Sequence, residues 1–288
     1  MKAALKNLTE IDSHHVKCFD LHEELGLAYL AEHGETTTLY LNHRASRSWL
    51  KGDYPHLEHV RWFELDSVIA WYRDESEAVI ISGKSWRKLA IGSPHRLLLS
   101  KNYIFVSYYE EGVRSRSDLL YLHHVVCTFT REGAFALGLE DLMIPSGFRD
   151  SFIEIEAGYT FGDHLAFVTC CLPDAIWILD VPKKHLRRIA VPFPTVALDV
   201  ITGDAKRAYA IYDNRGLLYA YPSLPSFEFA VFDLESEISS KQNFAVIEKP
   251  LIEAGFEMSA IKFQPNSTGK IIVSDGMKAA LLEFSEAA

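Results

Sequence analysis

Paired histidines and nucleophile motifs are the first places in this chain to look for chemistry. The two adjacent histidine pairs are at residues 14–15 and 123–124. Neighbours on a strand point to opposite faces, so neither pair can easily present both rings to one metal ion. The chain has no GxSxG, HExxH or EF-hand motif, and Gly269 and Lys270 lack the flanking residues of a phosphate-binding loop. The sequence therefore predicts packed or solvated histidines and no cofactor, and it favours a protein that is not an enzyme.

The composition of the 288 residues narrows the class of protein and of partner. A hydrophobic fraction of 48% with 12% aromatic residues argues against disorder. Asp and Glu number 39 against 29 Lys and Arg, and the resulting net charge of −10 disfavours nucleic acid and is compatible with a basic protein partner. No apolar stretch is long enough for a signal peptide or a membrane span, so we expect a cytoplasmic protein with no membrane partner.

A repeated β-meander is the clearest structural signal. Residues 259–284 contain three short apolar runs, separated by a Pro-Asn-Ser-Thr-Gly turn and an Asp-Gly turn. Residues 196–221 repeat the pattern, with Asp213 and Asn214 in place of the Asp-Gly turn. A unit of this kind cannot bury its apolar face alone, so it must stack on its neighbours.

Units of this kind recur along the whole chain, with starts near residues 16, 59, 96, 152, 196 and 259. Their spacing of roughly 40 to 60 residues is close to the period of propeller blades. Residues 235–255 depart from the alternation, and there we expect an excursion with one helical turn. Residues 112–122 and 141–150 are likewise expected to be longer insertions. The last unit lacks a fourth strand, which residues 3–8 are suited to supply.

At residues 174–221 and 259–284 the chain resembles a β-propeller of the broad WD40-like or YVTN-like kind. An apolar strand ending in Asp is followed there by a basic turn, a Pro and an acidic or Gly-rich hairpin, although the WD dipeptide and the GH signature are absent. The resemblance implies an all-β fold in which residues 1–288 form a single propeller. We expect six blades, with seven as the alternative, closed by the N-terminal and C-terminal strands.

The charge of the turns differs between the two faces of such a disc. The turns between second and third strands share one face with the links between blades, and acids outnumber Lys and Arg in them. The turns between third and fourth strands emerge on the other face and are mainly basic. We predict that the acidic face and its aromatic residues bind a partner. The predicted partner-binding residues are Glu32, Glu35, Asp74, Glu75, Glu77, Tyr108, Tyr109, Glu110, Glu111, Tyr212 and Asp213.

Three functions remain open at this point. The favoured hypothesis is a non-catalytic protein-binding propeller, in its sharpest form an inhibitor-like or immunity-like protein that covers a basic toxin or nuclease. Propellers resembling sugar-lactone hydrolases hold an axial metal with Glu, Asn and Asp, for which the candidates are Asp199, Asp213, Asn214 and Asp275. Asp, Asn and Gly are also what tight turns require. The third hypothesis is a scaffold subunit of a larger assembly. Turns are polar in most proteins, so the charge asymmetry could also have no function.

Overall fold

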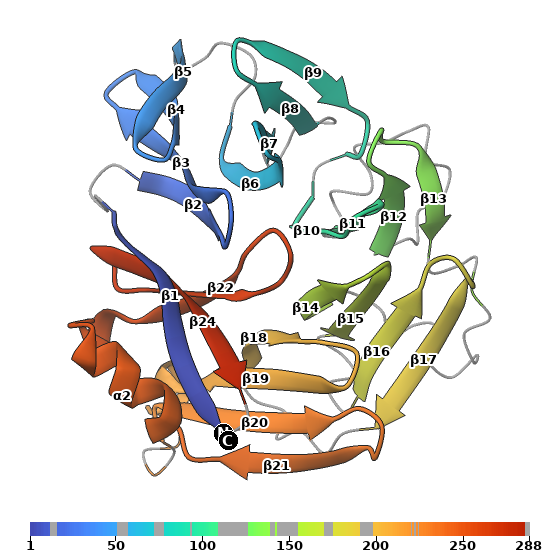
Figure 1. Ribbon diagram of the computed structural model, residues 1–288, viewed down its shortest axis with the longest axis vertical. Coiled ribbons are helices and arrows are strands. Elements are labelled where there is room, and N and C mark those ends of the chain that lie inside the picture. The colour runs from blue at the N-terminus through green and yellow to red at the C-terminus, as the bar shows by residue number, and fades with distance from the viewer. Residues whose placement is uncertain are drawn as a thin grey trace.

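In the computed structural model, the described residues form a ring of six four-stranded antiparallel sheets (Figure 1). The structure describes residues 1–11, 16–50, 57–71, 78–92, 94–108, 126–138, 142, 155–169, 175–190, 198–219, 221, 223 and 225–285. The predicted six-bladed β-propeller is therefore confirmed.

Each blade runs from an inner strand near the axis to an outer strand at the rim (Figure 1). Blade one contains β2 (Val16–His22), β3 (Gly26–His33), β4 (Thr36–Leu41) and β5 (Arg44–Leu50). Blade two contains β6 (His59–Glu64), β7 (Ser67–Trp71), β8 (Ala78–Ser82) and β9 (Ser85–Leu89). Blade three contains β10 (Arg96–Leu99), β11 (Tyr103–Ser107), β12 (Val126–Thr130) and β13 (Phe135–Gly138). Blades four and five contain β14 (Ile155–Phe161), β15 (His164–Thr169), β16 (Ala175–Asp180) and β17 (His185–Ala190); and β18 (Leu198–Gly203), β19 (Arg207–Asp213), β20 (Phe227–Asp233) and β21 (Ile238–Gln242).

Blade six joins the two ends of the chain. It contains β22 (Lys262–Pro265), β23 (Ile271–Ser274), β24 (Lys278–Ser285) and, as its outer strand, β1 (Lys2–Glu10). β1 pairs antiparallel with β24, with Leu5 opposite Leu282. The predicted closure by N-terminal and C-terminal strands is therefore confirmed, and it covers an edge of β24 that would otherwise be free.

The core lies between neighbouring blades. Middle strands such as β7 and β16 are buried along their whole length, because the blades on either side cover both of their faces. One apolar cluster, for example, joins Ile69 of blade two to Leu97 and Ile104 of blade three. This arrangement explains why the middle strands read as nearly continuous apolar runs in the sequence.

Several basic residues that follow the third–fourth turns lie on the outer strands, where they form a basic rim. Arg47 lies on β5, Arg87 and Lys88 on β9, and Arg187 on β17, and the last three are exposed. Edge strands present unpaired backbone groups, and charged side chains on them prevent pairing with other chains. Protection of sheet edges therefore accounts for the basic rim without a partner.

Blade five differs from its prediction. The third strand is β20 and not the end of the predicted repeat at residues 196–221, because β19 is followed by a connection that contains η3 (Arg215–Leu217). The expected excursion at residues 235–255 instead contains β21 and the nine-residue helix α2 (Ala245–Glu253), followed by η4 (Met258–Ala260). The Asp213 turn is therefore not equivalent to the tight turn at Asp275. None of the described helices is long and apolar enough to cross a membrane.

Candidate functional site

The predicted acidic face can be examined at five of its eleven residues. The other six, Asp74, Glu75, Glu77, Tyr109, Glu110 and Glu111, lie outside the described residues. Glu32, at the end of β3, forms an ion pair of 2.9 Å with Lys17 at the start of β2. Glu35 is exposed in the turn between β3 and β4. One of these two acids is therefore already balanced by a neighbouring cation.

Tyr108 and Tyr212 belong to the core and not to the surface. Each is only 2% exposed. The hydroxyl of Tyr108 donates to the backbone oxygen of Ile91, and the ring of Tyr212 packs in the cluster between blades four and five. The prediction that these rings anchor a partner is wrong, because strand ends in a propeller are covered by the neighbouring blade.

Asp213 has a structural role that sequence reasoning did not foresee. Its two carboxylate oxygens bind the guanidinium of Arg215, with Oδ1 2.9 Å from Nε and Oδ2 2.6 Å from Nη2. The same guanidinium donates to the backbone oxygens of Ser259 and Ile261 and lies 4.7 Å from the centre of the Phe227 ring. Bidentate pairing fixes the direction of Arg215, so this side chain ties the connection at residues 214–226 to blade six.

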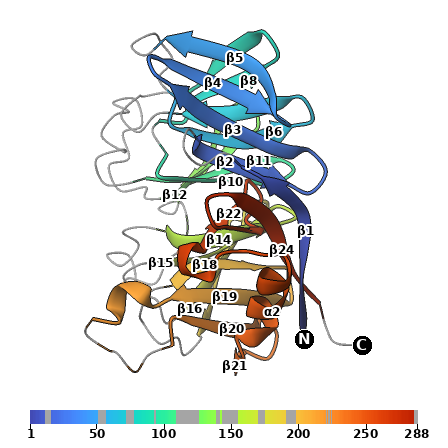
Figure 2. The same cartoon turned by 90° about the vertical axis from the view of Figure 1, so that its left-hand side faces the viewer.

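That connection presents two exposed aromatic residues. It projects from one side of the disc (Figure 2), and its backbone is held by hydrogen bonds from Leu217 N to Asn214 O and from Tyr221 N to Leu217 O, each 2.9 Å. Tyr219 is 89% exposed and Tyr221 is 59% exposed. Sequence reasoning missed both residues because it placed them in a strand. Pro222 and Pro225 nearby were the available signal against a strand.

Asp199 lies on a β-bulge at the start of the inner strand β18. Leu198 pairs with Tyr212 and Val200 with Ile211, so Asp199 is the extra residue. Burial, and then repulsion from Asp213, raise the pKa of Asp199 to about 6, although Arg96 and Arg215 oppose the shift. The backbone N–H of Phe263, on blade six, bonds to the carboxylate. A bulge can re-aim a side chain in this way, and it brings Asp199 into a mixed cluster of acids and arginines.

The four candidate metal ligands do not form a shared site in the structure. Asp213 binds Arg215, and the Asn214 amide donates to the backbone oxygen of Pro225 at 3.1 Å. Asp275 accepts the backbone N–H groups of Glu257, Met277 and Lys278. Across the described residues, no three His, Cys, Asp or Glu side chains converge in a way that could hold a metal ion. These side chains stabilise turns and connections.

The Asp199→Asn substitution should remove a pH dependence of stability between about pH 4 and pH 6. In this window the folded protein keeps a proton on Asp199 that the unfolded chain has lost, so the free energy of unfolding falls as pH rises. We expect the wild type to lose about 2 to 3 kcal/mol across it, at about 1.36 kcal/mol per pKa unit.

Urea unfolding of both proteins at several pH values measures this difference. The exposed Glu35→Gln serves as the control and should track the wild type. If the free energies of unfolding of wild type and Asp199→Asn differ by the same amount at every pH from acid to neutral, the pKa of Asp199 is not raised by folding.

On the side of the disc opposite the connection at residues 214–226, the turn between β22 and β23 reaches the centre of the ring (Figure 1). We call residues 266–269 the axial plug. Its backbone oxygens at Ser267 and Thr268 accept from the N–H groups of Leu99 and Thr160, at 2.7 and 3.1 Å. Its Ser267 N–H donates to Asp20 at 3.1 Å. The plug therefore bonds to blades one, three and four.

Asn266 holds the plug in shape. This fully buried side chain donates to the backbone oxygen of Leu21 at 3.1 Å, and its Oδ1 accepts the Thr268 and Lys270 N–H groups at 2.9 Å each. Asp20, which is also fully buried, bonds to the N–H of Trp62 as well as to the plug, and its burial raises its pKa. The inner ends of blades one, three and four are thus tied to blade six through one loop, and Asp20 extends the connection to blade two.

A cavity of about 480 Å³, which we call the axial cavity, lies on this side of the disc beside the axial plug. All six blades contribute to its wall, mainly through the turns between first and second strands. Its charged lining residues are Glu23, Glu24, Lys101, Arg131 and Lys270. The volume is in the range typical of small-molecule sites. Sequence reasoning missed this cavity, because it is assembled from short turns that are far apart in the chain.

Comparisons with known proteins bear on the fold alone. No family model matches the chain, and no curated protein matches it. Among solved structures, virginiamycin B lyase from Staphylococcus aureus has a TM-score of 0.53 and 9% identity, covering 96% of this chain and 99% of that one. A Bacteroides fragilis protein has a TM-score of 0.55 and 9% identity, covering 99% and 95%. A chain of the mitotic checkpoint complex has a TM-score of 0.54 and 9% identity, covering 92% and 73%. By architecture and by these likenesses, the chain is a six-bladed β-propeller.

Proposed function

We propose that this chain is a non-catalytic protein that binds another protein through the face carrying the connection at residues 214–226. The observation that carries the proposal is the exposure of Tyr219, at 89%, on a connection that Arg215 ties to blade six. Folds host many functions, so the argument rests on this site. A chain of the mitotic checkpoint complex has a similar fold, which makes a role in protein assembly compatible with the architecture.

The exposed tyrosines have the properties of interface anchors. Tyrosine offers a large contact area at low entropic cost, and it is enriched among residues that dominate binding energy. Tyr221 adds a second ring to the same connection, at 59% exposure. Arg215 holds the start of this connection through Asp213 and two backbone oxygens, which favours a fixed position for Tyr219.

The sharper proposal is that the partner is a basic protein and that this chain covers it, as an inhibitor-like or immunity-like protein does. The net charge of −10 would steer such a partner toward the chain. Glu35 contributes an exposed acid to the same face. The acids at residues 74–77 and 110–111, which lie outside the described residues, belong to the acidic face that the sequence predicts. A cytoplasmic location remains part of this proposal.

Replacing both Tyr219 and Tyr221 by alanine should weaken partner binding by about 30-fold or more, because two anchor side chains are lost. Affinity capture from lysate of the source cell, at low and at moderately high salt, supplies the partner, and titration of the purified pair measures the affinity. Leu65→Ala is the matched control, since Leu65 is 74% exposed in a turn on the other face.

The proposal expects a basic protein that wild type and Leu65→Ala retain, that salt weakens, and that the double variant fails to hold. Equal affinity of the double variant for the captured protein would refute the anchor role.

A further inference from the structure

The axial cavity and the proposed protein-binding face lie on opposite sides of the disc. The cavity opens on the side of the first–second turns, whereas the connection at residues 214–226 joins a second strand to a third. The plug forms part of its wall through Ser267 and Thr268, both held by backbone hydrogen bonds to other blades. A wall tied in this way is pre-formed, which lowers the cost of ordering on binding.

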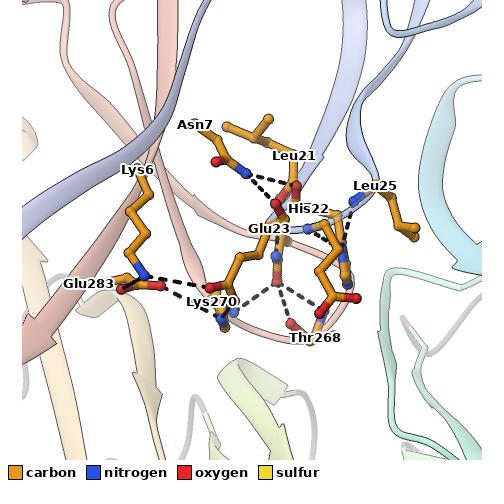
Figure 3. A network of polar contacts seen from close by, with 11 residues as sticks. Lys6, Asn7, Leu21, His22, Glu23, Leu25, Thr268, Lys270 and Glu283 are labelled. Carbon is orange, nitrogen blue, oxygen red and sulfur yellow. Dashed lines mark hydrogen bonds and ion pairs between the residues drawn. The ribbon is translucent and has the colours of Figure 1, made fainter.

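Part of the charge around the cavity is already balanced. Figure 3 shows a cluster that we call the polar latch, formed by Lys6, Asn7, Glu23, Lys270 and Glu283. Lys6 approaches Glu283 at 2.7 Å and Glu23 at 3.5 Å, while Lys270 pairs with Glu23 and lies 3.8 Å from Glu283. The hydrogen bond and charge of Lys270 lower the pKa of Glu23. Two lysines and two glutamates therefore neutralise each other.

The remaining charges favour an anion. Outside the latch, the charged lining residues are Glu24, Lys101 and Arg131, which leaves an excess of one positive charge. Lys101 is exposed, and no carboxylate in the described part of the chain lies within ion-pair distance of its ammonium group. In a protein with a net charge of −10, an excess of positive charge at one cavity, with both cations from one blade, is unexpected.

Arg131 is held at this wall by aromatic and backbone contacts. Its guanidinium lies 4.2 Å from the centre of the Phe63 ring and donates to the Phe63 backbone oxygen. Burial lowers the pKa of Arg131, while Glu64 and Glu132 are near enough to oppose that shift. Neither acid forms an ion pair with it in the described structure. A half-buried guanidinium without a carboxylate is costly to fold, and a bound anion would offset that cost.

We propose that the axial cavity binds a small ligand through a compact anionic group, a phosphate or a carboxylate, held by Lys101 and Arg131. The two cations come from the first–second and third–fourth turns of blade three, which emerge on the same face of the disc, and both line the cavity. Thr202 adds a hydroxyl-bearing residue to the lining from blade five, whereas the Thr160 hydroxyl already donates to the backbone oxygens of Leu99 and Thr268. Arginine suits the planar oxygen pairs of both anionic groups.

Calorimetric titration of the full chain with inorganic phosphate, and separately with succinate, tests the proposal at about 50 mM ionic strength, where screening is modest. Lys101→Glu should weaken binding by about tenfold or more, because a favourable charge becomes a repulsive one. Lys84→Glu is the matched control: it makes the same charge change at an exposed residue of the same face that does not line the cavity.

The two titrations distinguish the sources of the anionic group. Saturable binding of phosphate alone assigns a phosphate ligand, and saturable binding of succinate alone assigns a carboxylate ligand. Either result supports the proposal when Lys101→Glu weakens binding and Lys84→Glu changes it by less than about twofold. Absence of saturation by both anions up to about 20 mM, or equal weakening by the two variants, overturns it. The tyrosine variants of the other face should leave all these results unchanged.

Discussion

A chain that lacks residues 1–8 is expected to unfold about 10 °C below the intact protein. The deletion removes most of β1 and therefore frees the edge of β24. It also removes Lys6 and Asn7 from the polar latch, including the Asn7 amide bonds to the backbone oxygens of His22 and Glu23 at 3.1 and 2.7 Å. Lost backbone bonds and the lost burial of Leu5 together suggest a cost on the order of 4 kcal/mol.

Calorimetry of the intact and shortened proteins measures this effect. A synthetic peptide of residues 1–10, added to the shortened protein, provides the control, because it can re-form the β1–β24 pairing. We expect the peptide to restore much of the lost stability, in proportion to its concentration. An unfolding temperature that does not change on deletion would show that the ring does not depend on its closing strand.

The Gly269→Ala substitution in the axial plug should destabilise the protein by about 4 kcal/mol or more, because the new methyl group meets backbone and not space. A Cβ at this position would lie 2.3 Å from the Cα of Tyr159 on β14. The backbone at Gly269 also has a φ of +84°, which L-residues rarely adopt. Chemical unfolding at neutral pH provides the measurement.

Gly34→Ala separates the two causes. Gly34 has a φ of +61°, but no atom lies within 4 Å of the point that a Cβ would occupy there. This control should therefore cost only about 1 to 2 kcal/mol, the strain of a left-handed backbone. If Gly269→Ala and Gly34→Ala lower the free energy of unfolding by the same amount, the close approach of the axial plug to blade four does not add to the effect of the Gly269 substitution.

The ring itself could be predicted because its repeats are encoded locally. Strands such as β23 are indicated by short β-branched runs between turn residues, and β1 by the alternation that places Ala3 and Leu5 on its half-buried face. Such signals depend on neighbours in sequence. Counting the units was therefore enough to predict six blades and a closing strand.

The error in blade five has a long-range cause. Residues 217–221 have the apolar composition of a strand, but Arg215 bonds to Ser259 and Ile261, more than 40 positions away. These bonds hold the chain in a projecting connection and leave the third-strand position to β20. No local pattern around Tyr219 contains that information.

The candidate sites were less predictable than the fold. The sequence indicated that turns of one face carry acids, but it could not show that Asp213 would be taken up by Arg215 or that Tyr108 and Tyr212 would be covered. The axial cavity depends on turns from six blades meeting at one point. Lys101 and Arg131, 30 positions apart in the sequence, line the same cavity only when the blade is folded.

The pairing of β1 with β24 has a consequence for the order of folding. Lys2 and Ser285 are partners in this ladder, and contacts of such wide separation form late because closing the intervening loop costs entropy. Blades one to five are made of consecutive residues and can assemble during synthesis. β1, although made before β24, must wait for it. Until then it presents an unpaired strand, so a growing chain of this design exposes its own closing segment to chaperones and to mispairing for most of its synthesis.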